Sequence, residues 1–200
     1  MLPLSHVQVA IASTGVLALA LAVALGAAMR GGVGQPPLGA VDPGFATAST
    51  FELPLLDAGG TGAAGSFALG EYRDRPVFVY FWASWCTPCK SEAPLIQRLW
   101  PEFEARGYTF VGVNIQDQEQ DARRFIQEHR LTFPQVRDRE GAVYLDYGVY
   151  GLPESFFLKP GLLVHEKYLG EFDEAVLRQR LGAIDAGAAA SAPARTEARP

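Results

Sequence analysis

The chain has 200 residues, of which 48% are hydrophobic, enough for one domain with a substantial core and for further segments at its ends. A formal net charge of -5, without any cluster of Lys and Arg, argues against a nucleic-acid-binding protein. Two cysteines are too few for a disulfide-rich scaffold, and three scattered histidines, His6, His129 and His165, predict no zinc site.

The first 45 residues have the pattern of a membrane segment followed by a linker. Residues 7–29 contain no Asp, Glu, Lys or Arg, and about 20 apolar residues suffice to cross a bilayer as a helix. We expect residues 1–30 to form an uncleaved transmembrane anchor, with a cleaved signal peptide as the alternative. The dense Gly and Pro of residues 31–45 predict a flexible tether.

Residues 46–185 are expected to form one folded domain, followed by a disordered tail of small residues over 186–200. The domain begins with two short strand-like segments, 51–56 and 66–72, around a glycine-rich turn. An unbroken apolar run over 77–82 and the segment TFVGVNI over 109–115 then predict strands that are buried on both faces of a sheet.

Helices are predicted between and after these strands. Apolar residues recur at helical spacing after the second cysteine, although Pro94 and Pro101 should bend or interrupt that helix. A second helix should bury a face that includes Ala122 and His129, and the last helix should begin at Asp173, a good capping residue.

Residues 155–159 and 162–170 flank the turn Pro160-Gly161 and predict an antiparallel hairpin. Together with the alternating strands and helices before it, this hairpin predicts an α/β fold. We expect a central mixed sheet with helices on both faces.

The two cysteines lie in the sequence Cys86-Thr87-Pro88-Cys89, at the end of a predicted strand and the start of a predicted helix. A helix N-terminus stabilises a thiolate, so Cys86 is the expected nucleophile and Cys89 the resolving thiol. Proline is tolerated in the first helical turn. Half of a metal site or an inert structural bridge is the alternative, disfavoured by the missing ligands and by the two-residue loop.

The segment VFVYFWASWCTPCKSE, residues 77–92, resembles the active-site strand and helix of the thioredoxin superfamily, with Trp85 directly before the first cysteine. Glu92, the predicted anchor and YGVYGLPESF over 147–156 narrow this resemblance to the membrane-anchored TlpA/ResA-like thioredoxins. The last motif is most similar to the cytochrome c biogenesis branch, the CcmG/DsbE type. The resemblance implies a thioredoxin-like fold and a thiol:disulfide oxidoreductase without a cofactor beyond its own cysteine pair.

The resemblance also implies roles for residues outside the cysteine pair. Tyr80 replaces the buried acid of ordinary thioredoxin, and Glu92, one helical turn after Cys89, would exchange a proton with the resolving thiol. The alternative for Glu92 is a solvated carboxylate. Pro153 is expected to be cis and to face the dithiol, which leaves the backbone of Leu152 free to pair with an extended substrate.

The roles of two further residues have more than one interpretation. Glu154 gives the cleft an acidic rim or is a solvated turn carboxylate, while Trp85 shields the dithiol, contacts the substrate or caps the core. Tyr150 is expected to pack rather than to take part in chemistry. The expected substrate-binding residues are Trp85, Thr87, Pro88, Leu152, Pro153 and Glu154.

The function expected from these features is reduction of oxidised cysteines in exported proteins, by a domain held outside the cytoplasm. By resemblance, the partners are apocytochrome c or its haem-ligation factors, and the electron donor is a membrane thiol-electron transporter. A general extracytoplasmic disulfide oxidase or reductase, or a non-catalytic module that holds apocytochrome, are the alternatives. The direction of electron flow depends on the reduction potential.

Overall fold

The structure is a computed structural model, and it describes residues 46–56 and 65–191. The predicted anchor, the predicted tether and the last nine residues of the predicted tail lie outside this part of the chain. Within the described part, none of the helices has the length and apolar character needed to cross a membrane.

A five-stranded mixed sheet forms the centre of the domain, in the order β5-β4-β3-β6-β7. The strands β3, β4 and β5 are parallel, while β6 runs antiparallel to β3 and pairs antiparallel with β7 in the predicted hairpin. Both predicted buried strands have the expected bounds, and every residue of each strand is buried. The strands are β3 Val77–Trp82, β4 Thr109–Ile115, β5 Gln135–Asp138, β6 Glu154–Lys159 and β7 Leu163–Leu169.

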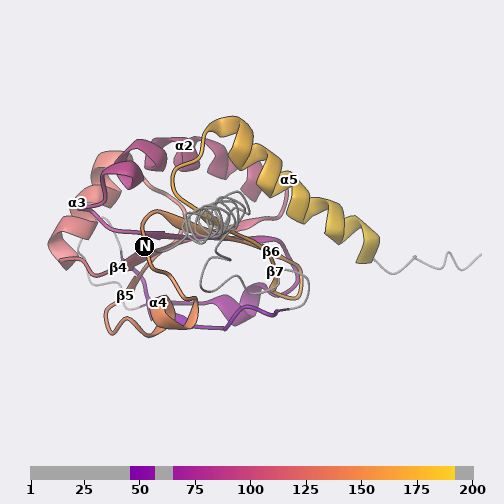
Figure 1. Cartoon of the computed structure of the whole chain (residues 1–200), viewed down its shortest axis with the longest axis horizontal. Coiled ribbons are helices and arrows are strands. Elements are labelled where there is room, and N and C mark those ends of the chain that lie inside the picture. Colours follow the sequence, from indigo (N-terminus) through magenta and orange to yellow (C-terminus); the bar gives the residue numbers. More distant parts are fainter. Residues whose placement is uncertain (1–45, 57–64, 192–200) are drawn as a thin grey trace, which may run out of the picture. The chain divides into compact units, whose positions relative to one another are not determined.

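Two hydrophobic clusters cover the two faces of this sheet. One face carries three helices, α2 Thr87–Glu104, α3 Glu119–His129 and α5 Glu174–Ser191 (Figure 1). The other face carries the short helix α4 Ala142–Asp146, the 3-10 turn Leu69–Tyr72 and the two-stranded antiparallel sheet of β1 Glu52–Pro54 and β2 Ser66–Ala68. The arrangement confirms the predicted thioredoxin-like α/β fold with a mixed central sheet.

Several elements differ from the sequence-based expectation. The strand β5 and the helix α4 were not predicted, since four and five residues are too few for a hydrophobic period to show. We expected Pro94 and Pro101 to bend or interrupt the helix α2, and it continues through both without an interruption. Its buried face outweighs the cost of the two prolines, about 3 kcal/mol each in a helix interior; that face comprises Cys89, Glu92, Ala93, Ile96, Leu99, Trp100 and Phe103.

The last helix also extends further than expected. We predicted a disordered tail from residue 186, whereas α5 runs to Ser191. The stretch after Asp185 is rich in alanine, the residue with the highest helix propensity, and this composition continues the helix.

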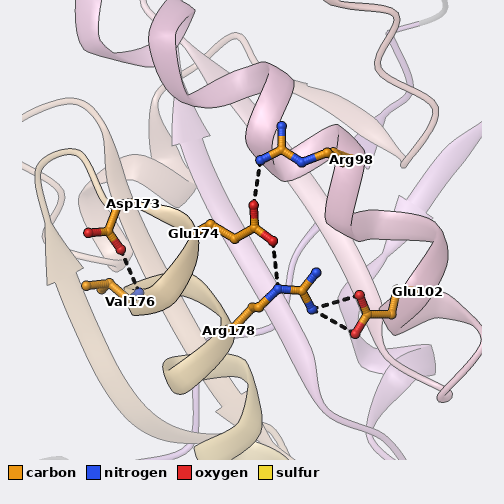
Figure 2. Close-up of polar contacts among 6 residues, drawn as sticks. All are labelled: Arg98, Glu102, Asp173, Glu174, Val176 and Arg178. Carbon is orange, nitrogen blue, oxygen red and sulfur yellow. Dashed lines mark hydrogen bonds and ion pairs between the residues drawn. The ribbon is translucent and has the colours of Figure 1, made fainter.

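Polar contacts at the start of α5 align it against α2 (Figure 2). The Glu174 carboxylate accepts hydrogen bonds from Arg98 of α2 and from Arg178, which also binds Glu102 of α2. The predicted cap is confirmed, because the Asp173 side chain accepts a hydrogen bond from the Val176 N–H at 2.8 Å. These side chains are exposed, so the buried Leu177, Leu181 and Ile184 supply the packing energy.

Replacing the capping residue tests how firmly α5 is held at this end. We expect Asp173→Ala to lower the free energy of unfolding by about 1 kcal/mol, because the first turn loses an acceptor for its N–H groups. Asp173→Asn keeps an acceptor and should cost much less. Chemical denaturation of both variants measures the difference, and equal losses in the two would show that the cap contributes nothing.

Candidate active site

The cysteine pair lies where the loop after β3 leads into α2. Cys86 is the N-cap of α2, and its Sγ accepts a hydrogen bond from the Cys89 N–H at 3.2 Å. The two residues are joined by a disulfide bond. Thr87 and Pro88 form the exposed first turn of the helix. Cys86 keeps a trace of exposure and Cys89 has none, so an incoming thiolate or disulfide meets Cys86 first.

The loop before Cys86 is held by the loop that follows β4. The Asp117 carboxylate accepts hydrogen bonds from the Ser84 N–H at 2.6 Å, the Ser84 hydroxyl at 2.7 Å and the Asn114 amide at 2.9 Å. The Trp85 indole N–H donates to the Gln116 carbonyl at 2.9 Å. The Trp85 ring is 56% exposed, so the idea that it caps the core is wrong, and its face is open to a partner.

Glu92 lies in the buried face of α2, one turn after Cys89. The residue is 1% exposed, and its Oε1 accepts a hydrogen bond from the Phe172 N–H at 3.0 Å. Burial raises the pKa of Glu92 from its ordinary 4.5 to about 8, although the Phe172 N–H and the Tyr80 hydroxyl pull this pKa down. A solvated carboxylate is therefore the wrong description of Glu92.

Tyr80 is a member of the site that the sequence did not reveal as functional. It is fully buried in β3, and its hydroxyl makes a long contact of 3.5 Å with the Cys89 carbonyl. Burial and the neighbouring Glu92 carboxyl raise the pKa of Tyr80 well above its ordinary value. The phenol thus stays neutral beside Cys89 and Glu92. Its position in place of thioredoxin's acid was the available signal.

The peptide bond between Leu152 and Pro153 is cis, as the resemblance implied. Glu154 pairs with Phe81 in the register of β6 and β3. The cis bond therefore lies next to the C-terminal end of β3, from which the chain continues to the cysteines. The Pro153 carbonyl accepts a hydrogen bond from the Gly170 N–H at 2.9 Å. Among the described residues, the backbone N–H and C=O of Leu152 have no hydrogen-bond partner, which leaves them available to a substrate strand.

Both interpretations of Glu154 are wrong. It is 1% exposed, so it is neither an acidic rim nor a solvated turn residue. Its carboxylate forms an ion pair with Lys167 of β7 and accepts hydrogen bonds from the N–H groups of Tyr150 at 3.1 Å and Gly151 at 3.4 Å. The residue therefore anchors the loop from within, because a neighbouring strand supplies a cation that neutralises it.

Tyr150 also differs from expectation. We expected its ring to pack, but the ring is 56% exposed. The Lys167 ammonium lies over the ring, 4.8 Å from its centroid. The described residues contain no group of three or more His, Cys, Asp and Glu side chains placed to hold a metal ion.

Comparison with known proteins agrees with this geometry. The model of the AhpC/TSA family matches residues 46–166. A thiol-disulfide oxidoreductase ResA of Geobacillus thermodenitrificans is 33% identical over 116 residues, 58% of this chain and 67% of the relative. A thiol:disulfide interchange protein DsbE of Pseudomonas fluorescens biotype C is 33% identical over 134 residues, 66% of this chain and 70% of the relative.

A solved structure supports the same placement. The crystal structure of a protein described as a DsbE from Chlorobium tepidum superposes with a TM-score of 0.62 and 29% identity. The match covers 69% of this chain and 94% of that one.

The buried carboxyl leads to a prediction about rate. We expect Glu92→Gln to slow thiol–disulfide exchange by about 100-fold where proton transfer limits the rate, because the amide keeps the shape of the side chain but cannot exchange a proton with Cys89. Stopped-flow exchange with a disulfide substrate, from about one pH unit below neutrality to about two units above it, measures the effect.

The exposed Glu104 at the end of the same helix provides the matched control, since Glu104→Gln makes the same chemical change away from the cysteines. Its rate should equal that of the parent. If Glu92→Gln also exchanges at the parent rate throughout the pH range, Glu92 has no part in the chemistry.

Proposed function

Given that the chain belongs to the AhpC/TSA family of thioredoxin-like proteins and is a thiol:disulfide oxidoreductase of the ResA/DsbE type, we propose that it works as a reductase of other proteins. The buried carboxyl of Glu92 beside Cys89 carries this proposal. Strong oxidants in this chemistry stabilise their reduced, thiolate-bearing form. In the reduced protein, a Glu92 carboxylate that has given up its proton disfavours a thiolate at Cys89, which makes the reduced form a better electron donor.

The forward reaction transfers two electrons from the dithiol to a partner. The Cys86 thiolate attacks one sulfur of the partner's disulfide, and the other partner sulfur leaves as a thiolate that takes a proton from water. Cys89 passes its proton to ionised Glu92 and attacks Cys86 Sγ. The mixed disulfide breaks, the second partner sulfur leaves as a thiolate that takes a proton from water, and the Cys86–Cys89 disulfide remains.

The cycle closes when an external dithiol reduces that disulfide. The donor's first thiolate attacks Cys86, and the Cys89 sulfur leaves with its electron pair. With a pKa of about 8, Glu92 is mostly protonated at neutral pH and can give its proton to Cys89 as this sulfur leaves. The donor's second thiol then releases Cys86, and the donor is left as a disulfide. The carboxyl thus returns the proton that it takes in the forward reaction.

We assign the partners by chemistry and by similarity. The partners are exported proteins with oxidised cysteine pairs, namely apocytochrome c or its haem-ligation factors, and the donor is a membrane thiol-electron transporter. The motif over residues 147–156 and the similarity to a DsbE and a ResA protein support this assignment. The apolar residues 7–29 support a membrane anchor that holds the domain on the outer face of the membrane. No cofactor beyond the cysteine pair is required.

A trapping variant tests the partner directly. We expect Cys89→Ser to accumulate a stable mixed disulfide through Cys86, because no second thiol remains to release the partner. Mass spectrometry of the trapped species should find proteins with the haem-attachment sequence Cys-x-x-Cys-His, or factors that attach haem.

Cys86→Ser is the matched control, since it should trap nothing although Cys89 remains. A trap filled with exported proteins unrelated to haem attachment would remove cytochrome maturation from the proposal and leave the reductase. An empty trap would contradict the reductase itself.

A further inference from the structure

A lysine of β7 lies in an unusual environment, close to the loop between α4 and the cis-proline bond. Lys167 pairs with Phe156 in the register of β6 and β7, and only 13% of its side chain is exposed. Its ammonium group forms the ion pair with Glu154 and donates a hydrogen bond to the Gly148 carbonyl at 2.6 Å. The same group lies 4.8 Å from the ring centroid of Tyr150.

Burial of this pair carries an electrostatic cost. Transfer of two charges from water into the protein is expensive, and burial lowers the pKa of Lys167 accordingly. The ion pairs between α2 and α5, by contrast, are exposed on both sides. A buried pair contributes little net stability compared with packed apolar side chains, so its main effect is to hold one arrangement of its neighbours.

Those neighbours are three residues shortly before the cis-proline bond. The Gly148 carbonyl accepts a hydrogen bond from Lys167, and the N–H groups of Tyr150 and Gly151 donate to Glu154. The pair therefore holds the backbone that leads to Leu152, whose own N–H and C=O have no partner among the described residues. The Lys167 ammonium lies over the Tyr150 ring, and Tyr150 is 56% exposed.

We propose that Lys167 is a positioning residue for polypeptide substrates. Together with Glu154 it holds the Tyr150–Leu152 loop in one conformation. In this conformation the Leu152 backbone and the exposed ring of Tyr150 bind an extended substrate chain, next to the substrate's reacting cysteine. This inference rests on the proposed function and adds a specificity device to it. A small disulfide meets only the sulfur atoms at Cys86. A polypeptide also needs the loop, because it gains backbone hydrogen bonds and a ring contact there.

The experiment compares the two kinds of substrate in the reduced full-length protein. We expect Lys167→Met to raise the half-saturating concentration of a disulfide-bonded peptide by about fivefold or more, because a loosened loop must be ordered on binding. The limiting rate with the peptide, and the rate with a small aromatic disulfide, should stay within about twofold of the parent, since neither depends on that ordering. Lys167→Arg keeps the charge and should restore most of the affinity.

Lys159→Met provides the charge-matched control, because Lys159 lies at the other end of β6 and should not change peptide affinity. If Lys167→Met fails to fold because Glu154 is left unpaired, the double variant Glu154→Gln/Lys167→Met replaces it and should show the same rise.

An unchanged half-saturating concentration, an equal loss with peptide and small disulfide, or unfolding of both variants overturns the role of Lys167. Inactivity of the parent towards the peptide, with exchange towards the small disulfide intact, would instead contradict the proposed function.

Discussion

The site depends on one constraint, the burial of the Glu92 carboxyl beneath the resolving cysteine. One oxygen of this carboxyl, Oε1, accepts a hydrogen bond from the backbone N–H of Phe172, a residue that precedes α5. The docking of α5 on α2 and the protonation state of the carboxyl are therefore coupled. Because the pKa of Glu92 is raised when the protein folds, protonation of Glu92 favours the folded state. That contribution is complete below pH 4.5 and is lost as the pH rises towards 8. The buried carboxyl that keeps a proton beside Cys89 thus lowers the stability of the folded protein at neutral and alkaline pH.

The rest of the site is arranged by polar groups that are themselves internal to the fold. On one side of the cysteines, Asp117 ties the loop after β4 to Ser84. On the other side, Glu154 and Lys167 organise the loop before the cis-proline bond. These charged side chains form their hydrogen bonds within the protein. The groups that remain accessible near the cysteines are the first turn of α2, the Trp85 ring, the Tyr150 ring and the backbone of Leu152. The open groups suit an extended polypeptide better than a small molecule.

Much of this architecture is predictable from local patterns. The strand β3 is an unbroken apolar run and β4 is a mostly apolar one. The cysteine motif with the spacing to Glu92 needs only the geometry of one helix. What escaped prediction depends on residues far apart in the chain. Glu154 looked like a solvent-facing acid because its partner Lys167 belongs to the next strand, and the role of Tyr80 needs its three-dimensional position beside Cys89. Pro94 and Pro101 do not interrupt α2, because burial of one helix face outweighs local propensity.

The central claim is that Glu92 holds its proton near neutral pH, and its titration can be followed directly by carbon NMR of the side-chain carboxyl in the oxidised protein. The account predicts a pKa of about 8 for this group, and the resonance should disappear from the glutamate set in Glu92→Gln. A pKa at or below the ordinary 4.5 would mean that the carboxyl is ionised throughout the working range. It would then have no proton to give to Cys89, and the proton exchange proposed for this site would be contradicted.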